Sequence, residues 1–165
     1  MQTGHPNIQH RLLGRISRDE SGAALVEFAL VIPVLLLLLL GMLDFGKAFN
    51  YWIDSTHLSA TGVRWAAVNT NPSADETLQE AIRDQADTAE LRDGGTDAIA
   101  DPVQVCVEFP DGTSNVGDPV RVTVTAGYNF LNFIGAKTGI TEADISGSST
   151  MRLEQVPTSY SEGCS

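Results

Sequence analysis

One apolar stretch near the N-terminus constrains this chain more than any other feature. Residues 23–43 contain a single charged side chain, the carboxylate of Glu27. At about 1.5 Å of rise per residue, a helix of this length crosses a hydrocarbon core of about 30 Å. Its segment 34–40, a valine followed by six leucines, is apolar on every side, unlike a helix on the surface of a soluble domain. We therefore expect a membrane-spanning helix.

The charges that flank this stretch predict its orientation. Three arginines precede it, and acidic residues outnumber Lys47 just after it. The three are Arg11, Arg15 and Arg18. Because basic flanks remain in the cytoplasm, we expect a single-pass protein of the cytoplasmic membrane with its N-terminus inside and its C-terminal domain outside.

Three kinds of N-terminal segment compete to explain these residues. A cleaved secretory signal has an apolar core of about 7–15 residues and a site of small residues behind it, whereas Asp44-Phe45-Gly46-Lys47 follows this span. A plain single-span anchor explains the length and the orientation but leaves Gly22 and Glu27 unexplained. A prepilin-type signal is cut on the cytoplasmic side, so its apolar helix is retained.

The third explanation is supported by a resemblance. Residues 15–50 resemble the N-terminus of TadE-like pseudopilins of the tight-adherence (Flp, type IVb) pilus system, whose TadF-type relatives share the same helix. The shared elements are a basic leader, Gly22 before the junction, Glu27 five residues after it with Phe28 beside it, Pro33 within the helix, and Asp44-Phe45-Gly46 at its end.

The resemblance implies that a membrane aspartic prepilin peptidase cuts after Gly22 and leaves Ala23 as the new N-terminus. In that family the glutamate matters for processing or for subunit contacts. The new ammonium group and Glu27 would lie about 6 Å apart along the helix axis, so the carboxylate could pair with its own terminus or with a neighbour's. The alternative is a glutamate that reaches the cytoplasmic headgroups by itself.

The same resemblance supplies the expected partners, which are the peptidase, other pilins and pseudopilins, the Tad assembly platform and membrane lipid. The protein would act in the inner membrane and could enter the extracellular pilus. The formal net charge is −11, and the three acidic and three basic residues before Asp44 cancel, so all of this charge belongs to the outer part. An acidic domain disfavours nucleic acid as a partner and favours solubility.

The outer part is expected to be α+β and pilin-like. We expect the membrane helix to continue as an exposed stalk over residues 48–69, followed by a second amphipathic helix from a Ser73 cap to about Leu91. Alternating valines predict strands at 103–107 and 120–124, and residues 145–154 predict a third strand of a small antiparallel sheet. The expected divisions are a leader (1–22), a span (23–43), a stalk (44–72) and an acidic helix-plus-sheet domain (73–165).

Aromatic residues and cysteines add two further expectations. Phe49, Tyr51 and Trp52 follow the span as an interfacial aromatic belt would. The apolar stretch 128–135 is expected either to be a buried connector under the sheet or, if exposed, to bind a partner.

Cys106 and Cys164 are the only cysteines and both are predicted to lie outside the membrane, where a disulfide can form. Such a bond would tie the C-terminal tail to the first strand and contribute roughly 4 kcal/mol in the chain-entropy model. The alternative is a pair of free or intermolecularly bonded thiols.

The sequence contains no recognised motif for catalysis, cofactor binding or metal binding. It has no glycine-rich phosphate loop, no His-Glu-x-x-His and no Cys-x-x-Cys, and His57 is the only histidine beyond the leader. We therefore expect no enzyme, no cofactor and no small-molecule substrate. Besides a pseudopilin, the alternatives are a membrane-anchored envelope protein whose acidic domain binds an unrelated partner, and a secreted hydrolase, which would need a polar pocket.

Overall fold

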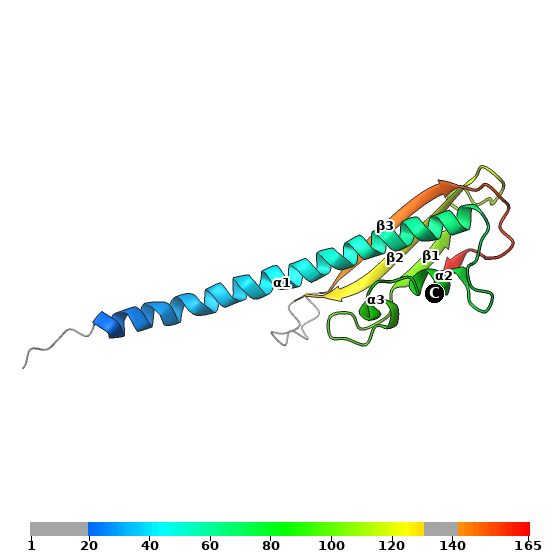
Figure 1. Ribbon diagram of the computed structural model, residues 1–165. Coiled ribbons are helices and arrows are strands. Elements are labelled where there is room, and N and C mark those ends of the chain that lie inside the picture. Colours follow the sequence, from blue (N-terminus) through cyan, green and yellow to red (C-terminus); the bar gives the residue numbers. More distant parts are fainter. Residues whose placement is uncertain (1–19, 131–141) are drawn as a thin grey trace, which may run out of the picture. The chain divides into compact units, whose positions relative to one another are not determined.

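The computed structural model describes residues 20–130 and 142–165. In chain order its elements are α1 (Glu20–Ala67), α2 (Leu78–Arg83), α3 (Ala89–Asp93), β1 (Gln104–Glu108), β2 (Pro119–Asn129), β3 (Glu142–Arg152) and β4 (Gly163–Cys164) (Figure 1). The predicted α+β class with a long N-terminal helix is confirmed. The leader arginines and Phe133 lie outside the described residues.

The chain divides into two units, Met1–Leu38 and Leu39–Ser165. The described part of the first unit is helical, and the helix continues through Pro33, although that residue has no N–H to donate to the preceding turn. From Gly22 onward the side chains of this part are exposed or nearly so. By length and composition, α1 is long and apolar enough to cross a membrane, as the sequence predicts.

In the second unit, one face of α1 packs against the sheet. Most of its buried residues follow each other at intervals of three or four, which is the period of a helix face. They include Asp44, Ala48, Tyr51, Ser55, Leu58, Ser59, Val63 and Ala66. The expectation of an exposed stalk is therefore wrong for this face, because the sheet covers it from the first turn after the predicted span.

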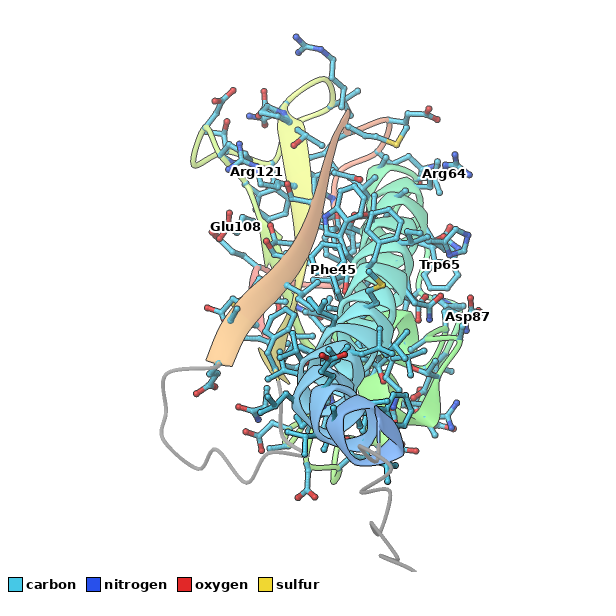
Figure 2. All side chains as sticks on the ribbon, turned by 90° about the vertical axis from the view of Figure 1, so that its left-hand side faces the viewer. Phe45, Arg64, Trp65, Asp87, Glu108 and Arg121 are labelled. Atoms are coloured by element: carbon cyan, nitrogen blue, oxygen red, sulfur yellow. A yellow bond between two sulfur atoms is a disulfide. The ribbon has the colours of Figure 1, made fainter. Side chains whose placement is uncertain are left out.

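The four described strands form one antiparallel sheet in the order β3-β2-β1-β4. The valines of β1 and β2 face α1 and are fully buried, whereas Glu108 and Arg121, opposite each other in the register, lie on the other face (Figure 2). The predicted hairpin and the third strand are confirmed. The fourth strand was missed because two residues, Gly163 and Cys164, are too short for an alternating pattern.

The second predicted helix is present as two shorter helices, and its predicted start is wrong. Ser73 donates its N–H to Asn71 in a turn, and the cap is Thr77, which exchanges hydrogen bonds with Glu80 in a capping box. Thr88 caps α3 separately. The sequence offers the same spacing of hydroxyl and glutamate at both possible starts, so the local pattern does not choose between them.

Two expectations about aromatic residues are resolved by burial. Tyr51 is buried and its ring lies 5.6 Å from that of Tyr128, so it does not belong to an interfacial belt, whereas Phe49 and Trp52 are exposed. Tyr128 is fully buried and Phe130 packs against the core beside it, with ring centroids 4.7 Å apart. The described part of the stretch 128–135 is therefore the end of β2 with Phe130 directly after it, packed against the core; residues 131–135 lie outside the described residues.

Candidate functional site

The predicted cleavage junction lies in the first turns of α1. Gly22 and Ala23 are helical and exposed, and a Cβ atom added to Gly22 would meet nothing within 4 Å. Neither packing nor backbone conformation therefore requires glycine at this position, although glycine costs about 1 kcal/mol relative to alanine inside a helix. A glycine that the fold does not need is consistent with recognition by another protein.

Glu27 lies on the same side of the helix as Ala23, because residues four apart are neighbours on a helix surface. Its side chain is exposed, as is the neighbouring Phe28. Among residues 20–130 and 142–165 no group forms a hydrogen bond or ion pair with this carboxylate. In a membrane an ionised carboxylate without a partner costs about 2.5–3.5 kcal/mol at mid-bilayer on insertion scales. The arrangement therefore leaves Glu27 able to pair with a cationic group from outside the described residues.

A buried polar contact joins the helix to the sheet directly after the apolar stretch. The hydroxyl of Tyr128 donates to Oδ1 of Asp44 at 2.6 Å, and it also lies 3.3 Å from the Asp44 carbonyl oxygen. Burial, followed by the hydrogen bond to Asp44, raises the pKa of Tyr128, so the phenol stays neutral and remains a donor. Tyr51, two turns further along the same buried face of α1, donates its hydroxyl hydrogen to the carboxylate of Glu90. These hydrogen bonds join α1 to β2 and α3 in the two turns that follow the apolar stretch.

Small residues allow α1 and β3 to approach closely. A Cβ atom added to Gly147 would lie 2.5–2.6 Å from backbone atoms of Ser55 and Thr56, so only glycine fits. One turn further along, the hydroxyls of Ser59 and Ser149 are 3.0 Å apart and hydrogen-bonded. The backbones of α1 and β3 therefore approach each other directly at Gly147, and two short side chains join them one turn further along.

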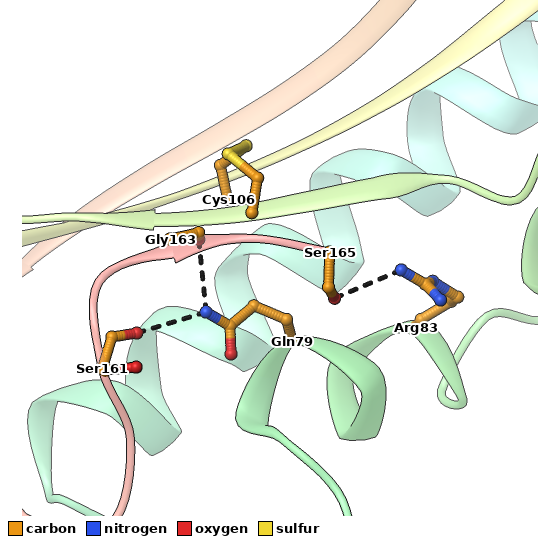
Figure 3. The surroundings of a disulfide bond; sticks show 7 residues. Gln79, Arg83, Cys106, Ser161, Gly163 and Ser165 are labelled. Atoms are coloured by element: carbon orange, nitrogen blue, oxygen red, sulfur yellow. Dashed lines mark hydrogen bonds between the residues drawn. A yellow bond between two sulfur atoms is a disulfide. The ribbon is translucent and has the colours of Figure 1, made fainter.

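The C-terminal tail is held along the free edge of β1. Cys106 and Cys164 are opposite each other in the register and form a disulfide, as expected from the sequence. Val105 and Ser165 exchange two backbone hydrogen bonds of 2.9 and 3.0 Å just beyond it. Figure 3 shows how Gln79 of α2 donates to two carbonyl groups of the tail, while Arg83 donates to the Ser165 hydroxyl.

A cavity of about 210 Å³ lies beside α1, lined by Asn50, Ile53, Asp54, His57 and Asp87. Oδ2 of Asp54 accepts the Asp87 N–H at 3.1 Å, and no described residue hydrogen-bonds to Oδ1. Burial, and then the charge of Asp87, raises the pKa of Asp54, although the Asp87 N–H and the nearby His57 oppose this shift. Within the described ranges, no cluster of three or more metal-ligating side chains is found.

The sequence points to the junction residues, whereas the contacts of Asp44, Tyr128 and Gly147 were missed. Tyr128 is 84 positions away from Asp44 along the chain, and no local pattern connects the two. The only sign of this contact in the sequence is Asp44, an aspartate that directly follows the apolar stretch. A buried acceptor at that position needs a donor, but the sequence does not say which residue supplies it.

Comparison with protein families gives one match. Residues 22–64 match the family model described as TadE-like protein. The matched range begins at the predicted junction glycine and ends within the last turn of α1, so the resemblance predicted from the sequence is confirmed for this helix. No curated protein and no solved structure matched the chain.

Proposed function

We propose that this chain, TadE-like over residues 22–64, is a minor pseudopilin that a prepilin peptidase cuts after Gly22 and that takes part in assembling a Tad-type pilus or a related secretion apparatus. The observation that carries the proposal is the position of the family match. It covers α1 from the junction through the apolar stretch to the part that packs on the sheet.

The proposed mechanism is mechanical. Before assembly, the apolar part of α1 holds the chain in the lipid. During assembly it passes from lipid into a bundle of similar helices and exchanges one apolar environment for another, so little hydrophobic free energy sets the position of one helix against the next. The Ala23 ammonium and Glu27 would set that position, because a charged pair in an apolar environment is favourable only when its two groups meet.

Hydrogen bonds of Asp44 and Tyr51 connect α1 to the C-terminal domain, so the position of the helix also sets the position of that domain. A displacement of α1 along its axis would move the domain with it, because Tyr128 of β2 is hydrogen-bonded to Asp44 and Glu90 of α3 is hydrogen-bonded to Tyr51. The acidic domain is thereby presented outside the membrane, where it would initiate, cap or regulate the fibre.

Cleavage is the test of the proposal. Co-expression of the full chain with a prepilin peptidase is expected to remove residues 1–22, which intact-mass measurement detects, and Gly22→Ala is expected to block the cut. Gly41→Ala is the matched control, because a Cβ atom at either glycine meets nothing within 4 Å and both changes leave the helix intact. A full-length product alongside active peptidase would instead favour a membrane-anchored envelope protein.

The role of Glu27 has a separate test. Glu27→Gln keeps the size of the side chain and removes its charge, so we expect it to be cut normally but to co-purify poorly with its pilin partners. Removing one member of a buried charge pair costs about 3–5 kcal/mol, which corresponds to an association roughly 100-fold weaker or more. Normal co-purification of the variant would show that the carboxylate does not set the position of the helix.

A further inference from the structure

The part of α1 in the second unit carries a row of large exposed apolar residues, which we call the aromatic stripe. It consists of Phe45, Phe49, Trp52 and Ile53, whose exposed fractions are 67, 51, 47 and 50%. Their spacing of four, three and one positions keeps them on one side of the helix. The adjoining face of the helix, with Ala48 and Tyr51, is buried.

The stripe has a defined beginning and end. It continues the apolar surface of Met42 and Leu43, which are also exposed, and it stops at Ile53. Beyond that residue the same side of the helix carries Thr56 and Arg64, which are polar and exposed. The exposed apolar surface is therefore short. Its length suits the narrow zone between hydrocarbon and water, whereas a partner that packed along the whole outer part of α1 would need a longer apolar surface.

The length of the stripe fits that zone. Trp52 lies nine residues after Leu43, about 14 Å along the axis. Long side chains of a helix point back toward its N-terminus, so the rings lie roughly a turn, about 5 Å, closer to the membrane than their own backbone. The headgroup zone on each side of a bilayer is about 5–8 Å thick, and aromatic rings are enriched there.

We propose that the aromatic stripe lies in the headgroup zone of the outer leaflet, where α1 leaves the hydrocarbon core. The net charge of −11 disfavours an anionic surface, so the expected lipid is zwitterionic. This contact does not depend on cleavage at Gly22 and belongs to the chain while it is in the membrane. Transfer into a fibre would require the stripe to leave the lipid.

The two tryptophans of the chain provide the test. Trp65 lies 13 residues beyond Trp52, about 20 Å further along the axis, and is partly buried against the core. Full-length Trp65→Phe protein, which retains Trp52, and Trp52→Phe protein, which retains Trp65, are reconstituted at low density into phosphatidylcholine vesicles. A fraction of the lipid carries a spin label on the headgroup or bromine near the top of the acyl chain.

Trp52 is expected to be quenched at least threefold more strongly than Trp65. Equal and weak quenching of both would overturn the proposal. Quenching of Trp52 that falls as the protein density rises at constant lipid composition would also overturn it, since a second copy of the chain would then cover the stripe.

A paired substitution tests the stripe itself. Phe45→Ser with Phe49→Ser in the Trp65→Phe background is expected to lower the quenching of Trp52 at least twofold. The matched control is Val116→Ser with Val156→Ser, which removes two exposed apolar side chains far from α1 in sequence and should leave the quenching unchanged. Near-ultraviolet circular dichroism reports whether each variant remains folded. Folded proteins with equal quenching in both pairs would contradict the proposal.

Discussion

At Gly147 the backbone of β3 lies so close to that of α1 that a methyl group does not fit. Gly147→Ala would place Cβ at 2.5–2.6 Å from the backbone of Ser55 and Thr56, and backbone atoms cannot turn aside as a flexible side chain can. We expect the change to destabilise the outer domain by about 1–3 kcal/mol through overpacking. The measurement is urea unfolding of the full-length protein in detergent micelles, followed by near-ultraviolet circular dichroism.

Gly127→Ala on the neighbouring strand is the control for this prediction. The nearest atom to its added Cβ would be a carboxylate oxygen of Glu142 at 3.5 Å, which is an ordinary contact. Its effect on the free energy of unfolding should stay within about 0.5 kcal/mol. Equal stability of the two variants would mean that helix and sheet can separate slightly at no cost.

Asp54 makes the stability of the outer domain depend on pH. Burial raises the pKa of this carboxyl in the folded state, so the folded protein holds the proton more tightly than the unfolded chain does. The contribution to stability is complete below the unfolded pKa of about 3.9 and is lost as the pH rises through the folded value. Asp54→Asn removes this dependence, so we expect the variant to become more stable relative to the wild type as the pH increases from 3 toward 7.

Thermal unfolding of both proteins in micelles at a series of pH values measures this difference. Hydrogen bonds lower the pKa values of other carboxyl groups, such as Asp118 and Glu80. Both proteins contain these groups, so their effect on the pH dependence cancels in the difference between variant and wild type. Asp97→Asn removes an equal charge from an exposed position and is the control. A difference between Asp54→Asn and wild type that does not change with pH would refute the prediction.

At the scale of the elements, the disulfide and the short strand β4 are expected to act together. Reduction should destabilise the outer domain by roughly 4 kcal/mol in the chain-entropy model, because the unfolded chain gains the freedom of a large loop. It should also release β4, so the Val105 amide, which donates to Ser165 at 2.9 Å, loses its protection from hydrogen exchange. The Val103 amide donates to Leu91 instead and is the internal control.

Hydrogen exchange of the oxidised and reduced protein measures both effects. Exchange at Val105 should increase more than exchange at Val103, whose partner is outside the tail. If the two amides respond equally, the tail stays in place without the disulfide, held by contacts such as those of Gln79.

Elements could be predicted from the sequence wherever a local repeat specifies them. Alternating valines at 103–107 and 120–124 gave two strands because one sheet face is buried and the other is not. The contacts that join elements have no such repeat. The bond between Asp44 and Tyr128 and the close approach at Gly147 depend on which residues the fold brings together, and β4 depends on a disulfide and two backbone hydrogen bonds rather than on its own propensity.

The proposed junction stands out in the sequence for a different reason. Gly22 is a poor helix former and Glu27 is the only charge in the apolar stretch, so both can be recognised in the sequence without any knowledge of the fold. The structure adds that the fold requires neither residue, because both are exposed and Gly22 has open space around it. Residues that a fold does not require are candidates for recognition by a partner, whereas Gly147 is required by packing.

At the scale of the whole molecule, we expect the distribution of charge to set the orientation of the apolar helix in a membrane. The apolar stretch of α1 is equally suited to either orientation, so the flanking charges must decide. We predict that replacing Arg11, Arg15 and Arg18 with glutamate gives a mixed population in which part of the chains leave the outer domain in the cytoplasm. Proteinase K added to spheroplasts measures the orientation, since it digests only domains that are outside.

A charge-matched variant separates orientation from net charge. Arg64, Arg92 and Arg121 replaced with glutamate change the total charge by the same amount, but these residues lie more than 20 positions beyond the apolar stretch. Because basic residues influence orientation only within about 15–20 residues of a span, this variant should be digested as completely as the wild type. If both triple variants are protected to the same extent, net charge and not the leader governs insertion, and the assignment of the acidic domain to the outside loses its physical basis.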